Sequence, residues 1–214
     1  MTQKKSKAEP QDMADQPFEK TDLILDAAVK VFADKGYYGA RVSDIAQEAG
    51  IAYGLVYHYF KNKEDLLISI FRTRWHQFDQ ALRRIMKEKD DPREMIHSIV
   101  SFLFHSYKNN PKMIEVMVLD VAKSARFFNG DNIKQFKDVF DLISEIVRLG
   151  QRRGIFKDDL DAKLAAYSLY GSLERIMLWW VLEGKRIITD QEARSATKMV
   201  TAILLSGLEQ KGTT

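Results

Sequence analysis

The chain has 214 residues, 45% of them apolar, and carries a formal net charge of +3 with a pI near 8.9. It contains no cysteine, which excludes a thiol nucleophile, a disulfide framework and a cysteine-ligated metal. No stretch approaches the ~18 uninterrupted apolar residues of a membrane span, and the N-terminus lacks the apolar core of a signal peptide, so we expect a cytoplasmic protein without membrane contact.

The N-terminal segment is expected to be a tail followed by one helix. Residues 1–17 are polar and aperiodic, which predicts disorder. From Leu23 to Phe32 the apolar residues recur with helical spacing, and Gly36 ends this helix. The tail either attracts DNA weakly or is merely solvated. Its basic residues are Lys4, Lys5 and Lys7.

The segment from Arg41 to Lys63 is the most informative part of the chain. Its first half places apolar residues at i, i+3, i+4 and i+7 from Val42, which predicts a short amphipathic helix. Gly50 then suits a turn, because glycine takes a positive φ without a Cβ clash. The second half turns Val56 inward and leaves tyrosines and a histidine outside. Two short helices joined at a glycine form a helix-turn-helix, whose second helix enters the major groove of DNA.

The charges of this segment also suit nucleic acid. Between Ile51 and Lys63 there is no Asp or Glu, although 29% of the chain is charged. Phosphates repel carboxylates and attract lysines and N–H groups. Asn62 is predicted to cap the next helix, with Asp65 at its N3 position, and the positive helix end beside Lys63 can bind an anion. An ordinary pair of core-forming helices is the alternative, but a solvated face rarely carries two tyrosines and a histidine.

A long helix is expected to follow, from Lys63 to about Lys89. At 1.5 Å per residue it extends roughly 40 Å and is the only continuous connection from the DNA-binding part to the rest of the chain. No alternating run is long enough to predict a sheet, so the expected fold is all-α. Further helices are expected at about 92–108, 112–124, 131–153, 160–183 and 190–210.

These residues, in their order, resemble the N-terminal domain of TetR-type transcriptional regulators. The match runs without a gap from about Lys20 to Leu67 and includes Ala49-Gly50-Ile51, Tyr57-His58-Tyr59-Phe60 and Lys63-Glu64-Asp65-Leu66. The resemblance implies a helix-turn-helix domain at 18–64, a helical effector-binding and dimerisation domain at 65–210, and a C-terminal tail at 211–214.

The resemblance also implies which residues contact operator DNA. Ser43 and Lys63 would hold the DNA backbone from either side. Arg41 stands where a small hydroxyl residue is common, and we predict a phosphate contact from it. Ala52 and Leu55 replace the Ser or Thr of many family members, so the operator sequence cannot be inferred from relatives. The recognition helix would supply Tyr53, Gly54, Tyr57, His58 and Tyr59.

The last two helices are predicted to form a dimer. The helix near 160–183 is apolar on more than one face and must be covered from several sides. In the TetR family these two helices pair with those of a second subunit in a four-helix bundle, and two-fold symmetry matches a palindromic operator. A monomer that buries both helices internally is the alternative. The predicted dimerisation residues are Leu169, Ser172, Ile176, Ala196, Val200, Ile203 and Leu204.

The middle helices are rich in aromatic residues and methionine, which suits either a plain core or a pocket for a variable apolar ligand. A charge such as Glu174 or Arg175 in an apolar helix needs a partner, either across subunits or on an acidic ligand. The predicted effector-binding residues are Phe102, Tyr107, Met113, Met117, Tyr170, Arg175 and Trp179.

Beyond the first domain the chain is similar to fatty-acid-degradation regulators of the FadR type. The likeness lies in Gly171-Ser172-Leu173-Glu174, Trp180-Val181-Leu182 and Gly207-Leu208. It implies a long-chain acyl-CoA as the effector that releases the repressor from DNA. A multidrug-type or other hydrophobic effector remains an alternative. The anionic head would use Arg126, Arg152 or Arg153.

Enzyme function is not expected. His97 and His105 are too far apart to chelate as i, i+4 ligands, and the acidic run Asp158-Asp159-Leu160-Asp161 suits the start of a helix better than a metal site. No metal or cofactor is predicted. We therefore expect a homodimeric, ligand-released repressor of palindromic operator DNA. An effector-independent DNA-binding protein is the remaining alternative.

Overall fold

The computed structural model describes residues 17–120 and 130–209, and within these ranges the fold is all-α, as predicted. The predictions for the tail, including Lys4, Lys5 and Lys7, for Arg126 and for residues 211–214 lie outside the described residues. In the described part, one isolated bridge between Phe156 and Glu209 is the only strand-like pairing, and no helix is long and apolar enough to cross a membrane. The helices are α1 (Pro17–Gly39), α2 (Val42–Glu48), α3 (Tyr53–Tyr59), α4 (Lys63–Glu88), α5 (Pro92–Asn109), α6 (Pro111–Leu119), α7 (Asp131–Arg152), α8 (Ala162–Leu182) and α9 (Asp190–Leu208).

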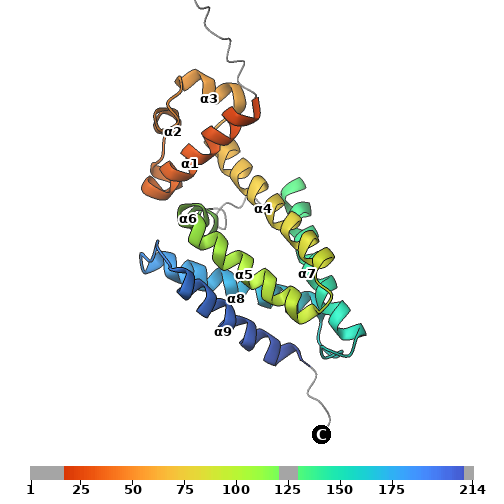
Figure 1. Cartoon of the computed structure of the whole chain (residues 1–214). Helices are drawn as coiled ribbons and strands as arrows, with labels where there is room; N and C mark the ends of the chain where they lie inside the picture. Colours follow the sequence, from red (N-terminus) through yellow and green to blue (C-terminus); the bar gives the residue numbers. More distant parts are fainter. Residues whose placement is uncertain (1–16, 121–129, 210–214) are drawn as a thin grey trace, which may run out of the picture.

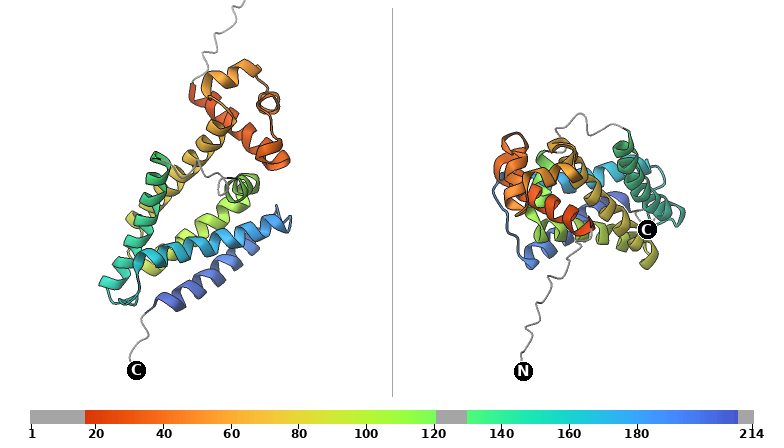
Figure 2. Two further views of the ribbon diagram at one scale, coloured as in Figure 1. Left: turned by 180° about the vertical axis from the view of Figure 1, so that it is seen from behind. Right: turned by 90° about the horizontal axis from the view of Figure 1, so that it is seen from above.

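The helices form a small N-terminal unit and a larger body (Figure 1). Helices α1 to α3 gather at one end, and α4 leads from them into the body, where it packs against α7. Helix α5 is central and contacts α4, α6, α7, α8 and α9. Helix α9 lies on the side of the body away from α1–α3 (Figures 1 and 2). This arrangement separates the predicted DNA-reading end from the predicted dimerisation helices.

Sequence features explain where the long helices begin. The Asn62 side chain accepts a hydrogen bond from the Asp65 backbone N–H at 2.9 Å and so caps α4, as predicted. In a capping box the Asp65 carboxylate would accept a hydrogen bond from the backbone N–H of Asn62. Here it accepts from the backbone N–H of Lys61 instead, at 2.9 Å. Asp161 likewise caps α8 by accepting from the N–H groups of Lys163 and Leu164, both at 2.8 Å.

Aromatic packing around Trp75 holds α4 against its neighbours. The indole stacks on Phe71 of its own helix and on Phe136 of α7, at ring-centroid distances of 5.2 and 5.0 Å. The edge of Tyr170 from α8 meets it at 5.5 Å, and the indole N–H donates to the Gln135 carbonyl at 3.2 Å. Such ring pairs add about 0.5–1.5 kcal/mol each beyond burial, so the middle of α4 is fixed to two helices of the body.

Gly150 marks a close approach that only glycine permits. A Cβ at this position would lie 2.1 Å from the Phe156 ring, and Phe156 is buried. The absent side chain lets the chain turn tightly after α7 and lets Phe156 pack under the helix end. A methyl group here would displace that ring or the helix.

The N-terminal unit contacts the body at a second place besides α4. Helix α1 packs against α6, and Lys112 Nζ donates to both carboxylate oxygens of Asp34, at 2.8 and 2.9 Å. Arg186, from the α8–α9 connection, pairs with Glu115 at 3.0 Å and donates to the Ala33 carbonyl at 3.4 Å. The prediction that α4 alone links the two units is therefore incomplete: α6 touches α1 directly.

Candidate functional site

The α2–α3 pair has the predicted helix-turn-helix geometry. Gly50 takes φ of +66°, and the Ile51 N–H donates to the Ala46 carbonyl at 3.0 Å. Val56 is buried, whereas Tyr53 and Tyr57 are 53% and 44% exposed. Gly54 and His58 are exposed as well, so these four residues form the outward face of α3.

Tyr53 and Tyr57 form a pair one helical turn apart. Their hydroxyl groups lie 3.0 Å apart, and their rings meet edge-on with centroids 5.2 Å apart. This hydrogen bond is the main reason that the pKa of Tyr57 lies above its ordinary value. The Tyr57 hydroxyl therefore stays protonated at neutral pH, and the hydrogen bond and the ring contact hold the two side chains against each other. Two tyrosine hydroxyls on a helix face with no carboxylate suit hydrogen bonds to phosphate oxygens or base edges.

Tyr59 differs from the other members of the predicted reading face. It is half-buried and packs against the core, with its ring 5.1 Å from that of His58. Tyr59 therefore presents less of its surface to solvent than Tyr53 and Tyr57 do, and the DNA contact that the resemblance implied for it stays a prediction.

The start of α2 carries the other predicted contacts. Arg41 and Ser43 are exposed, while Asp44 accepts from the Arg41 backbone N–H at 3.1 Å and pairs with Lys35 at 3.0 Å. The Lys35 hydrogen bond, followed by that of Arg41, holds the pKa of Asp44 below its ordinary value. The Asp44 carboxylate is thus ionised but partly neutralised by Lys35.

The Lys63 side chain, predicted to contact phosphate, is hydrogen-bonded within the protein. Its ammonium donates to the carbonyls of Tyr37, Tyr38 and Ala40, at 2.6, 3.3 and 2.9 Å, and lies 4.6 Å from the centre of the Tyr37 ring. These are the orphan carbonyls that follow the kink of α1 at Gly36. The side chain therefore ties the α1–α2 turn to the first residue of α4, and the Lys63 backbone N–H at the α4 N-terminus also suits a phosphate.

Replacing Lys63 with Met is expected to weaken operator binding about three- to tenfold without changing its salt dependence. The loss comes from a looser α1–α2 turn, since bonds to a charged group contribute about 1.5–3 kcal/mol each. A true phosphate contact would instead lower the slope of log K against log salt by about 0.9. Fluorescence anisotropy over a salt series measures both quantities. Lys61→Met is the matched control, because the Lys61 side chain is exposed. If Lys63→Met reduced the slope of log K against log salt as much as Lys61→Met does, this would contradict the role of Lys63 in holding the α1–α2 turn.

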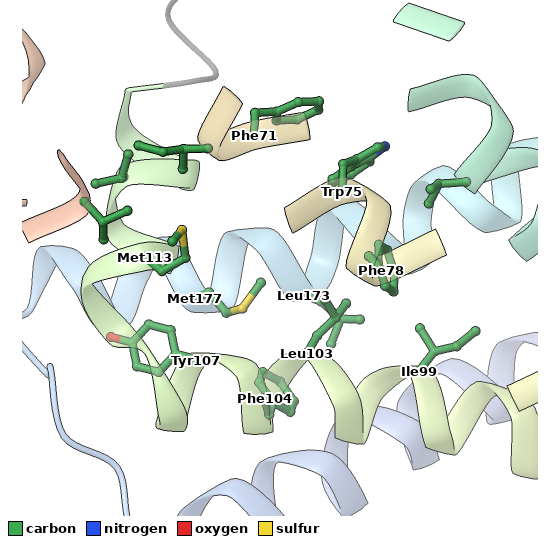
Figure 3. Close-up of a cluster of buried hydrophobic side chains, with 14 of the residues drawn as sticks. Phe71, Trp75, Phe78, Ile99, Leu103, Phe104, Tyr107, Met113, Leu173 and Met177 are labelled. Carbon is green, nitrogen blue, oxygen red and sulfur yellow. The ribbon is translucent and has the colours of Figure 1, made fainter. Parts of the chain in front are cut away.

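The body contains a cavity of about 230 Å³ between α4, α5, α6 and α8. Figure 3 shows Trp75, Phe78, Leu103, Met113 and Met177 among the side chains packed in this region. Its lining is mostly apolar, and its polar rim includes Gln77 and Asn109, which are exposed. Four predicted effector residues line it: Phe102, Met113, Met117 and Tyr170.

Three predicted effector residues lie elsewhere. Tyr107 is buried beside the cavity, and its hydroxyl donates to the Lys185 carbonyl at 2.6 Å; burial raises its pKa to about 12. Trp179 is 58% exposed, and Arg175 is also exposed. Because α8 turns about 100° per residue, these two lie on the side away from Met177. The periodicity of an almost wholly apolar helix could not show this.

Arg74 is the one cation among the cavity-lining residues of the described ranges, and sequence reasoning missed it. Of the arginines predicted for an anionic head, Arg152 pairs with Glu145 at 2.7 Å and Arg153 donates to the Asp90 carbonyl. Neither lines the cavity. The sequence feature that could have indicated a place for Arg74 at the cavity is its position directly before the buried Trp75, at the border of the apolar face of α4.

Helices α8 and α9 carry a set of large apolar side chains that are exposed to solvent. We call it the α8–α9 face, and its large residues are between 41% and 64% exposed. Leu169, Ala196 and Val200, predicted at the dimer interface, are instead buried in the protomer's own core, whereas Ile203 lies on the face. Ser172, Ile176 and Leu204 are half-buried. The α8–α9 face consists of Leu164, Tyr167, Trp179, Leu182, Met199 and Ile203.

Comparison with known proteins agrees with this geometry. Residues 24–70 match the family model for bacterial regulatory proteins of the tetR family, and residues 71–204 match the C-terminal region of YsiA-like proteins. The chain belongs to the TetR family. Relatives of this regulator are transcriptional regulators rather than enzymes, as the sequence predicted. Within the described ranges of this family member, no group of three or more His, Cys, Asp or Glu could hold a metal.

Three matches place this TetR-family regulator near fatty-acid regulators, which confirms the FadR-type resemblance. The fatty acid metabolism regulator protein of Bacillus subtilis is 30% identical over 188 residues, which cover 88% of this chain and 95% of that protein. The fatty acid degradation regulator FadR from Bacillus halodurans is 32% identical, with a TM-score of 0.81, over 92% of this chain and 99% of that one. The FadR from Bacillus subtilis, solved in complex with stearoyl-CoA, is 29% identical, with a TM-score of 0.76, over 87% of this chain and 98% of that one.

Proposed function

We propose that this protein is a repressor whose homodimer binds a palindromic operator and is released by a long-chain acyl-CoA. The apolar cavity beside α4 and α6 carries the proposal, because both helices contact the DNA-binding unit. The stearoyl-CoA bound to the Bacillus subtilis relative supports this ligand class. We expect the α8–α9 face to join two subunits and to place two α3 helices about 34–36 Å apart in successive major grooves.

The size of the cavity explains how ligand binding can act on DNA binding. At about 230 Å³ it is smaller than the 300–1,000 Å³ of typical ligand pockets. A long acyl chain therefore fits only if the lining helices move apart. Met113, Ile114 and Met117 line the cavity from α6, while Lys112 of the same helix holds Asp34 of α1. Displacement of α6 or α4 by the chain would reorient the reading helices and make DNA binding and ligand binding mutually unfavourable.

Arg74 is our candidate for the anionic head of the ligand. It replaces Arg175, Arg152 and Arg153 in this role because it lies at the rim of the cavity. A guanidinium suits phosphate and carboxylate groups through paired N–H donors. A multidrug-type pocket would not need this cation. A preference for negatively charged ligands therefore distinguishes an acyl-CoA regulator from a multidrug-type regulator.

Calorimetric titration with stearoyl-CoA tests the ligand assignment. Each buried methylene contributes ~0.8 kcal/mol, so burial of only six of them favours stearoyl-CoA over free CoA by a factor on the order of 10³. Binding of free CoA with similar affinity would overturn the acyl assignment. Equally tight binding of uncharged apolar drugs would favour the multidrug alternative, and an absence of any ligand would favour an effector-independent DNA-binding protein.

A further inference from the structure

Arg74 lies where the cavity meets the DNA-binding unit. A second, smaller groove of about 190 Å³ runs between α1 and α4 and shares Arg74, Gln77 and Met113 with the cavity. From α1 it is lined by Asp22, Leu25 and Asp26. A ligand that fills the cavity and extends past Arg74 therefore reaches α1 itself, without any intervening helix.

The Arg74 guanidinium interacts with a residue of its own helix α4 and with a residue of α1. One guanidinium nitrogen donates to Gln77 of the same helix at 2.9 Å. Another lies 3.8 Å from the carboxylate of Asp26 on α1. The two side chains of this ion pair are 31% and 66% exposed, so an incoming anion can reach the guanidinium. The pair joins the ligand-binding helix to the first helix of the DNA-binding unit.

We propose that the anionic head of the effector binds Arg74 in competition with Asp26, and that this exchange weakens DNA binding beyond the effect of filling the cavity. The proposal rests on the proposed function. Once an anion occupies Arg74, Asp26 loses its counter-charge, and Asp22 and Asp26 both face the negative head across the groove. Repulsion then acts on α1 directly. An uncharged ligand of equal length fills the cavity but leaves the Arg74–Asp26 pair intact.

The expected size of this effect follows from the solvent exposure of the Arg74–Asp26 ion pair. An exposed ion pair is worth up to about a factor of five in an equilibrium constant. The competition should therefore weaken operator binding by a factor of roughly two to five. This factor multiplies the weakening that comes from displacement of α4 and α6. Because coupling is reciprocal, the same factor appears whether ligand affinity or operator affinity is measured.

Two ligands with the same thioester and acyl chain test this device: lauroyl-CoA, and lauroyl-pantetheine, which lacks the phosphates together with the adenosine. Operator affinity and ligand affinity are measured for the wild type, Asp26→Asn, Arg74→Gln and the double variant. We expect Asp26→Asn to bind lauroyl-CoA about two- to fivefold more tightly, and its operator affinity to fall correspondingly less on ligand addition. Arg74→Gln should lose about tenfold in lauroyl-CoA affinity, with lauroyl-pantetheine unchanged within twofold.

Asp22→Asn is the matched control, because it removes the same charge from the same groove one helical turn earlier. A smaller effect of Asp22→Asn than of Asp26→Asn supports direct competition for Arg74. Equal effects of the two, or strictly additive effects of Asp26→Asn and Arg74→Gln, would overturn it. Failure of the proposed function looks different, since neither ester would then weaken operator binding by the wild type.

Discussion

Replacing Trp179 with Glu is expected to produce a monomer that binds the operator at least about 100-fold more weakly. Trp179 is 58% exposed on the α8–α9 face, and Ile203 on α9 is 64% exposed. A carboxylate buried between two such faces would have no partner and would oppose association. Two linked α3 helices bind DNA about 10²–10⁴-fold more tightly than one, because the second binds at a high effective concentration. A monomer loses this gain in affinity.

Sedimentation equilibrium and operator anisotropy measure the two consequences together. Ile187→Glu is the matched control, because Ile187 is 86% exposed in the connection between α8 and α9 and outside the α8–α9 face. The control should stay dimeric with unchanged operator affinity. A dimeric Trp179→Glu protein with full operator affinity would show that the subunits associate through another surface.

Replacing Met117 with Trp is expected to yield a repressor that no longer responds to acyl-CoA. Met117 lines the cavity from α6, and an indole there would occupy much of its ~230 Å³. Acyl-CoA affinity should fall at least about tenfold, because the acyl chain loses the apolar surface that it would bury. Operator affinity without ligand should stay within twofold of the wild type, since α2 and α3 are untouched.

Leu119→Trp serves as the control on the same helix, because Leu119 is half-buried and does not line the cavity. It should keep the wild-type response to acyl-CoA. Thermal unfolding of both variants separates a blocked cavity from a damaged fold. If Met117→Trp binds acyl-CoA and releases DNA normally, the effector occupies a different site.

Local signals were enough to predict the fold. Caps and breakers such as Asn62, Pro92 and Gly36 act on their own neighbourhood, and α4 ends at Glu88, one residue before the predicted end. The reading face of α3 was also predictable, because a short helix with one apolar side can only turn that side inward. Tyr53, Gly54, Tyr57 and His58 are exposed for this reason.

Tertiary contacts decided the rest. Helix α8 is apolar on several sides, so its period could not show that Leu169 faces the protomer's core while Leu164 and Trp179 face outward. The three carbonyls that hold Lys63 lie 23 to 26 residues away in sequence. Arg74 lines a cavity that is assembled by four separate helices. No spacing rule within one segment could reveal these arrangements.

The most direct test of the account is the affinity of the wild-type protein for its operator, measured with and without saturating stearoyl-CoA and with free CoA as the control. We expect stearoyl-CoA to raise the operator dissociation constant by a factor on the order of 10–100, and free CoA to leave it unchanged. An unchanged operator dissociation constant, with stearoyl-CoA demonstrably bound in the cavity lined by Phe102, Met113 and Tyr170, would contradict the coupling of ligand and DNA binding.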